Sequence, residues 1–168
     1  VKQNPKVSTK SKMNLERINF QILTKKYILA KNNHFMNTKA EKVSLLCDMI
    51  AFAIVDGELH EREYMFLSII AVELGISKEE LNQLFHEEHR SEIIKSEFER
   101  IQQFYRLALL MHCDGVLHER EEIKIREIGI NMGLNPFAMK RVLKAMEESP
   151  TSMVHPDFLL EVFQEQHN

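Results

Sequence analysis

The chain has 168 residues, of which 44% are hydrophobic and 28% are charged, with a formal net charge of -3. This length provides one ordinary hydrophobic core, and the sequence has no run of about 18 apolar residues that would suggest a membrane span. We therefore expect a soluble globular protein, and a cytoplasmic one because Cys47 and Cys113 are most simply interpreted as reduced thiols.

Charge is divided unevenly along the chain. Residues 1–35 contain eight Lys/Arg and one acid, whereas residues 36–168 contain fourteen Lys/Arg and 24 Asp/Glu. We interpret residues 1–35 as a basic, flexible N-terminal extension, or as an upstream segment from a misassigned start, and residues 36–168 as a single folded domain. The acidic charge of this domain argues against nucleic-acid binding and favours cations or basic partners.

The domain is predicted to be all-α. Its apolar residues recur with helical spacing, and no segment alternates apolar and polar residues over the length of a strand. In chain order we expect helices over residues 38–55, 60–74, from Ser77 onwards, 91–113, 119–132 and 136–149, and a short last helix after Pro156.

An octapeptide occurs twice in this helical pattern. DGELHERE at residues 56–63 returns as DGVLHERE at residues 114–121, and the same shift aligns Gly75 with Gly133. We therefore predict a compact bundle of about seven helices, built from two pseudo-symmetric repeats at about 38–90 and 91–148.

Part of the octapeptide is explained by helix geometry. Each Asp-Gly pair is expected to end one helix, and Leu59 and Leu117 are expected to insert into the core just past the turn. His60 and His118 are interpreted as N-caps of the following helices, each with a Glu three residues later. Turn formation alone does not account for the identity of Asp, His, Glu and Arg in both copies.

The remaining identity suggests a divalent cation. The spacing D-G-x-L-x-x-x-E resembles the second half of a calcium-binding loop, but the preceding positions are apolar or histidine, so one copy offers too few oxygen ligands. Two half-sites facing each other would supply more, and the predicted ligands are Asp56, Glu63, Asp114 and Glu121. Four carboxylates favour calcium or magnesium over zinc.

Motifs of nucleophilic catalysis, phosphate binding and dinucleotide binding are not found in the sequence. We therefore expect a binding protein and not an enzyme.

The two motif-bearing segments, AIVDGELHEREYMFLSIIAVELGIS and MHCDGVLHEREEIKIREIGINMGLN, resemble the tellurite-resistance TerB superfamily, which includes the N-terminal domain family of the DjlA co-chaperone. The resemblance covers residues 38 to about 148. It implies a helical bundle with internal pseudo-symmetry, an acidic cation site at the four carboxylates, and a partner-binding role in stress response or in membrane-associated complexes. The alternative is a metal-free interaction or structural protein whose acidic face binds a basic partner.

Overall fold

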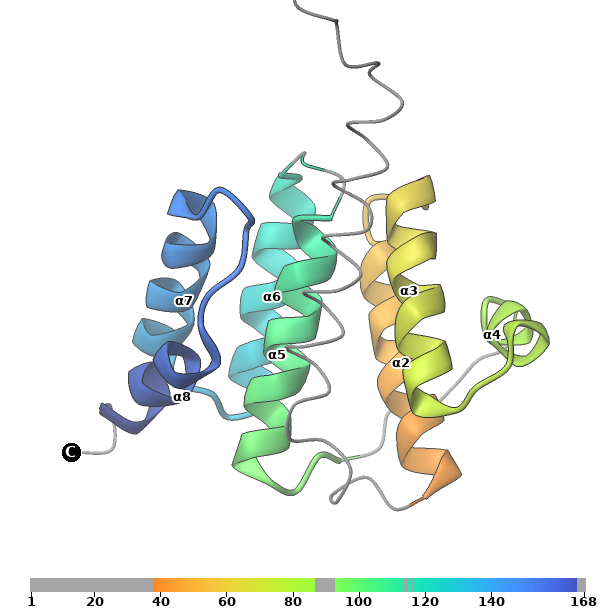
Figure 1. Ribbon diagram of the computed structural model, residues 1–168, viewed down its shortest axis with the longest axis horizontal. Helices are drawn as coiled ribbons and strands as arrows, with labels where there is room; N and C mark the ends of the chain where they lie inside the picture. Colours follow the sequence, from red (N-terminus) through yellow and green to blue (C-terminus); the bar gives the residue numbers. More distant parts are fainter. Residues whose placement is uncertain (1–37, 87–92, 114, 116, 166–168) are drawn as a thin grey trace, which may run out of the picture. The chain divides into compact units, whose positions relative to one another are not determined.

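The computed structural model describes residues 38–86, 93–113, 115 and 117–165 (Figure 1). All of them belong to one compact unit, Phe35–Asn168. The described residues form seven helices and no strand, which confirms the all-α prediction. The helices are α2 (Lys39–Ala53), α3 (Glu61–Leu74), α4 (Lys78–Leu84), α5 (Glu97–Met111), α6 (Glu119–Asn131), α7 (Pro136–Glu148) and α8 (Pro156–Gln164).

Side-chain caps fix several helix starts. The Ser77 hydroxyl accepts a hydrogen bond from the Glu80 amide, and the Glu80 carboxylate accepts one from the Ser77 amide, which is the predicted capping box. Thr38 and Glu41 form the same arrangement at the start of α2. Asn135 caps α7, with Pro at the first helical position as the sequence predicts.

The start of α5 differs from the prediction of a helix over residues 91–113. Residues 93–96 are not helical, and α5 begins at Glu97 with Ser96 as its N-cap. The Arg100 guanidinium donates hydrogen bonds to the carbonyls of Ile94 and Lys95, at 3.3 and 2.8 Å. These carbonyls are therefore bound by a side chain instead of by the backbone amides four residues later that a continuous helix would provide. Residues 91 and 92 lie outside the described residues.

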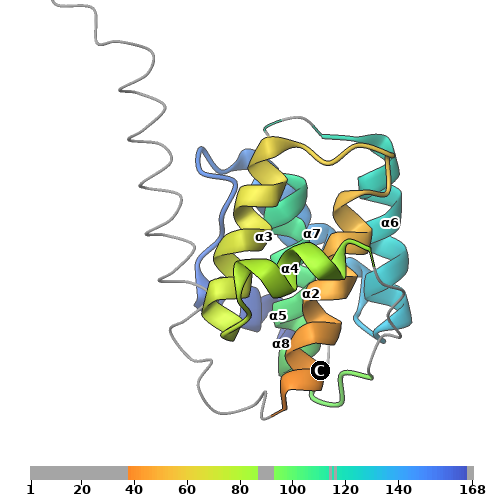
Figure 2. The ribbon, with the colours of Figure 1, turned by 90° about the vertical axis from the view of Figure 1, so that its right-hand side faces the viewer.

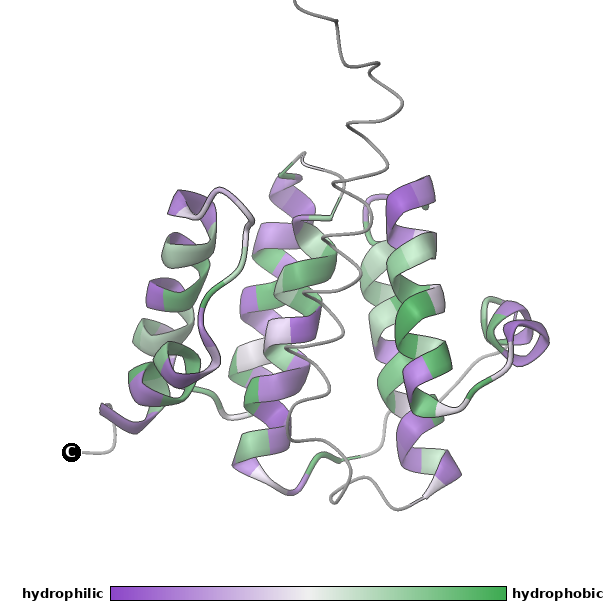
Figure 3. Cartoon of the chain, viewed as in Figure 1, coloured by the Kyte–Doolittle hydropathy of each residue, from purple (hydrophilic) through white to green (hydrophobic). Residues whose placement is uncertain are grey.

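The core is formed around α5, which packs against both α2 and α6. The middle of α3 is hydrophobic, and the first turns of α3 and α6 are hydrophilic (Figure 3). The largest buried side chains include Phe52, Phe66, Phe104, Leu46 and Leu107. In the part of the chain that the structure describes, no helix has both the length and the apolar character needed to cross a membrane.

Equivalent positions of the two octapeptide-bearing segments lie close together. The Gln103 side-chain amide donates a hydrogen bond of 3.2 Å to the carbonyl of Leu45, 58 residues earlier, and 58 is the offset between the octapeptides. This contact joins α5 to α2 at two positions that share the offset of the octapeptides. The α2–α3 and α5–α6 connections lie at the same end of the helices (Figure 2).

The prediction that Leu59 and Leu117 insert into the core is wrong. Their exposed fractions are 38% and 42%. Each leucine lies one residue before an N-cap. The buried side chains in the first turns of α3 and α6 are those of Glu63 and Glu121, which are each 3% exposed. The leucines therefore lie beyond the end of the core.

Candidate metal site

The candidate site lies between the α2–α3 and α5–α6 connections, and its carboxylate is that of Asp56. Gly57 follows with a φ of 97°, a left-handed conformation that glycine adopts without strain, so the chain turns sharply here. Oδ1 of Asp56 accepts a hydrogen bond of 3.1 Å from the Glu58 amide. This Asx turn fixes the carboxylate and leaves its second oxygen to face the other connection.

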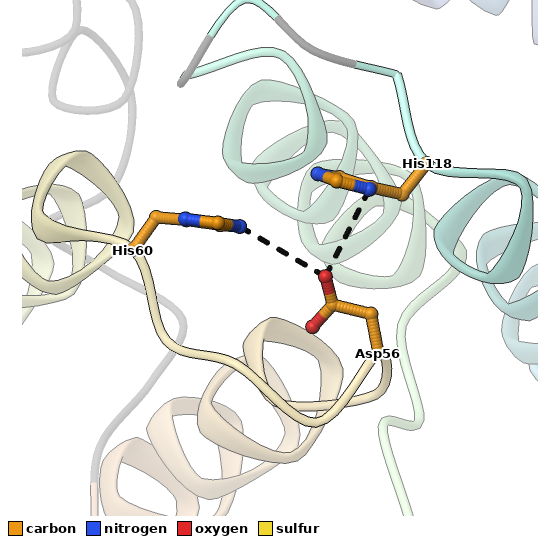
Figure 4. Close-up of side chains that lie close together, drawn as sticks. All are labelled: Asp56, His60 and His118. Atoms are coloured by element: carbon orange, nitrogen blue, oxygen red, sulfur yellow. Dashed lines mark ion pairs between the residues drawn. The ribbon is translucent and has the colours of Figure 1, made fainter.

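Two imidazoles point toward that second oxygen (Figure 4). Oδ2 of Asp56 lies 3.9 Å from Nε2 of His60 and 3.9 Å from Nδ1 of His118. The two rings stack with centroids 5.6 Å apart and planes 10° from parallel. His60 and His118 occupy the same place in the two octapeptides, so this is a second contact between equivalent residues.

The three side chains are partly shielded from solvent, with exposed fractions of 16% for Asp56, 35% for His60 and 32% for His118. A separation of 3.9 Å is too long for a hydrogen bond. The Nε2 atom of His60 is buried and has no hydrogen-bond partner among the described residues. A carboxylate and two imidazoles are thus held close together, and neither ring donates a direct hydrogen bond to the Asp56 oxygen.

The distances suit a shared cation. One ligand atom from each of Asp56, His60 and His118 lies within 4.8 Å of the other two. Ligands around a tetrahedral zinc ion stand about 3.3 Å apart, given bonds of about 2.0 to 2.1 Å. Each contact to Asp56 would therefore shorten by roughly half an ångström on binding, which side-chain rotation can provide.

The structure brings together one of the four predicted carboxylates, Asp56, with the two histidines. Glu63 has another role: its carboxylate accepts a hydrogen bond of 2.7 Å from the backbone amide of His60, which caps α3. Glu121 occupies the equivalent place in α6 and is equally buried. Neither glutamate belongs to the group around Asp56. Asp114 lies outside the described residues.

The histidines were predicted as N-caps, and both do occupy the N-cap positions of their helices. Their place in the cluster is what the sequence interpretation missed. The signal that could have revealed it is the presence of His at the same position in both octapeptides, combined with the expectation that the two copies face each other.

Other acidic and histidine residues in the described part of the chain do not form such a group. Among the described residues, Asp56, His60 and His118 are the only set of three or more His, Cys, Asp or Glu residues arranged to share an ion. His155 and Asp157 approach to 3.3 Å, but they are 67% and 72% exposed and stand as a pair at the start of α8. The Asp56 cluster therefore has one more candidate ligand than this pair, and its side chains are less exposed.

The fold and the cluster together define a helical bundle with a candidate cation site. Comparison with protein-family models, with curated proteins and with solved structures gives no significant match. The TerB resemblance therefore rests on the repeated motif and its spacing.

Proposed function

We propose that this chain is a non-enzymatic helical module that binds a divalent cation through Asp56, His60 and His118. The module acts as an adaptor in a stress-related protein complex of the tellurite-resistance TerB type. Its compartment is the cytoplasm, because Cys47 and Cys113 are expected to be reduced thiols.

One observation carries the cation part of the proposal. A single carboxylate oxygen lies 3.9 Å from a nitrogen of each of two imidazoles, and the two imidazoles come from different helix connections. A bound cation offers each of these three atoms a partner at bonding distance, which they do not offer one another. A ligand role also explains why His occupies the same position in both octapeptides.

The adaptor part is supported by the TerB resemblance alone. That resemblance implies an unidentified protein partner, of the kind found in stress-response or membrane-associated complexes, with no direct insertion of this chain into the membrane. The acidic charge of residues 36–168 argues against a nucleic-acid partner. A metal-free interaction module is the second candidate function. The observation in its favour is the Glu63 cap, which accounts for one of the repeated acids by helix stability alone.

Calorimetric titration separates the two candidates. The full chain is stripped of ions with a chelator, dialysed, and titrated with calcium, magnesium and zinc, and its thermal unfolding is followed with each ion. We expect saturable binding of at least one ion and a higher unfolding temperature in its presence, since a ligand that binds only the folded state stabilises it.

Two substitutions locate the binding. Asp56→Ala is expected to abolish it, while Asp157→Ala, which removes an aspartate from the exposed His155 pair, leaves it unchanged. No heat and no thermal shift with any ion at millimolar concentration would support the metal-free module. Equal loss in both variants would show that binding reflects general acidity and not this site.

A further inference from the structure

We infer that the ion selected by this site is a transition-metal ion of the zinc class, held by Nε2 of His60, Nδ1 of His118 and Oδ2 of Asp56. The inference rests on the proposed function and names the ion for the same site. It departs from the preference for calcium or magnesium, which assumed four carboxylate ligands.

The kinds of ligand atom argue for this ion class. Calcium takes six to eight oxygen ligands, and magnesium is usually bound by oxygens and retained waters. Imidazole nitrogen suits zinc, copper, iron and nickel. Two of the three ligand atoms in the cluster are imidazole nitrogens, and only one is an oxygen. Among the described residues, a hard ion would find a single protein oxygen in this cluster.

The Glu63 carboxylate already has a partner and is not free to serve as a further oxygen ligand. Glu63 is 3% exposed and its carboxylate receives the backbone amide of His60 at 2.7 Å. Moving it to an ion would leave that amide without its cap, at a cost of about 1 kcal/mol. Recruiting Glu63 to build the oxygen-rich ligand set that calcium needs would therefore disrupt the cap of α3.

The ligands are also oriented before an ion arrives. The Glu58 amide holds Oδ1 of Asp56, so that Oδ2 faces the histidines. Stacking of the His60 and His118 rings places both imidazoles in nearly parallel planes beside that oxygen. Three protein ligands leave the fourth position of a tetrahedral zinc ion to a water molecule.

The test compares ions on the stripped, dialysed full chain. Zinc and cobalt are expected to bind with one ion per chain, and zinc at least about 100-fold more tightly than calcium or magnesium. Nitrogen NMR of the labelled imidazoles adds an atom-specific result. Zinc is expected to shift Nε2 of His60 and Nδ1 of His118, because these are the nitrogens that face Asp56.

Substitutions of the histidines supply the controls. His60→Gln and His118→Gln are each expected to weaken zinc binding by about 100-fold or more. His86→Gln, which changes an exposed histidine just after α4, is expected to leave it unchanged. The double variant His60→Asp with His118→Asp replaces nitrogen by oxygen and is expected to shift the preference toward calcium. Circular dichroism checks that each variant stays helical, and the NMR result on the unaltered chain stands even where a variant unfolds.

The outcomes separate this inference from the proposed function. Calcium or magnesium binding as tight as that of zinc, abolished by Asp56→Ala, overturns the ion class and leaves the cation module standing. Zinc binding that survives both histidine substitutions overturns the ligand assignment. Absence of binding by every ion overturns the inference together with the proposed function.

Discussion

Glu63 illustrates how a residue of a ligand type can serve the fold instead. It lies in a motif that resembles half of a calcium loop, and yet its side chain is 3% exposed and accepts a hydrogen bond from the His60 amide. A buried carboxylate is stabilised by such a bond, because it otherwise loses its hydration without replacement. The same contact orders the residue that carries one of the imidazoles.

Substitution of Glu63 separates the two roles. Glu63→Ala is expected to lower the free energy of unfolding by about 1 to 2 kcal/mol, because it removes the cap, and Glu63→Gln by less, because the amide oxygen can still accept the bond. Chemical denaturation measures both. Ion affinity measured on the folded Glu63→Gln variant is expected to stay within about threefold of the unaltered chain. A loss comparable to that of Asp56→Ala would instead make Glu63 a ligand.

Arg106 is a charged side chain in the middle of α5 that is 4% exposed. Burial lowers the pKa of Arg106 to about 10, against an opposing influence of Glu99. In the folded state the guanidinium therefore loses its proton more readily than in the unfolded chain, where the arginine keeps its ordinary, higher pKa. The unfolded chain binds more protons between these two values, so this group's contribution to stability rises with pH in that window and is unfavourable below pH 10.

Arg106→Met is accordingly expected to raise the free energy of unfolding at neutral pH by about 1 to 3 kcal/mol, because an apolar chain of similar length removes a buried charge. Arg100→Met is the matched control. It removes two hydrogen bonds to the carbonyls before α5 and is expected to cost about 1 to 2 kcal/mol. Urea unfolding compares the two. Destabilisation by Arg106→Met as large as that by Arg100→Met would mean that the guanidinium makes net favourable contacts.

At the scale of elements, the cation site links the α2–α3 connection to the α5–α6 connection. Asp56 and His60 come from the first and His118 from the second. An ion bound at this place would therefore hold both connections at once. Ion binding should therefore stabilise both connections, although they are separated by more than 50 residues along the chain.

Hydrogen exchange tests this link. Saturating zinc is expected to slow exchange of backbone amides in residues 58–63 and in residues 117–121 together, since a ligand at 100 times its dissociation constant adds about 2.7 kcal/mol to folded-state stability. In His118→Gln the slowing should vanish from both segments. Slowing confined to residues 58–63 in the unaltered chain would contradict an ion shared by the two connections.

The leucines of the octapeptides belong to the same connections. Leu59→Ala and Leu117→Ala are each expected to cost less than about 1 kcal/mol, because both side chains are more than one-third exposed. Leu67→Ala in α3 removes a fully buried side chain and is expected to cost about 2 to 5 kcal/mol. Thermal unfolding of the three variants gives the comparison. If Leu59→Ala lowered the free energy of unfolding as much as Leu67→Ala does, Leu59 would have to pack in the core.

At the scale of the whole molecule, the helices follow from the sequence because their signals are local. Ser77, Asn135 and the glycines after α3 and α6 each act within a few residues, and they set helix ends where they were predicted. The start of α5 was misplaced because Arg100 binds the carbonyls before it, and a side chain reaching back several residues leaves no periodic trace in the sequence.

The site is less accessible to sequence reasoning because it depends on how two distant segments meet. The repeat indicated that equivalent residues could approach one another, but it did not say which of Asp, His or Glu would lie between the two connections. The structure places the histidines there, stacked at 5.6 Å, and turns Glu63 back onto its own helix. The direction of each side chain at the helix start determines which residues lie in the cluster. A spacing pattern in the sequence does not give that direction.

The central claim is that Asp56, His60 and His118 bind one cation between the two connections. Anomalous X-ray diffraction at the zinc absorption edge, from crystals of the full chain grown with zinc, tests it most directly. We predict an anomalous peak about 2.0 to 2.2 Å from Oδ2 of Asp56, Nε2 of His60 and Nδ1 of His118. A map with its zinc peak elsewhere, or with the three side chains unmoved and no peak between them, would contradict the claim.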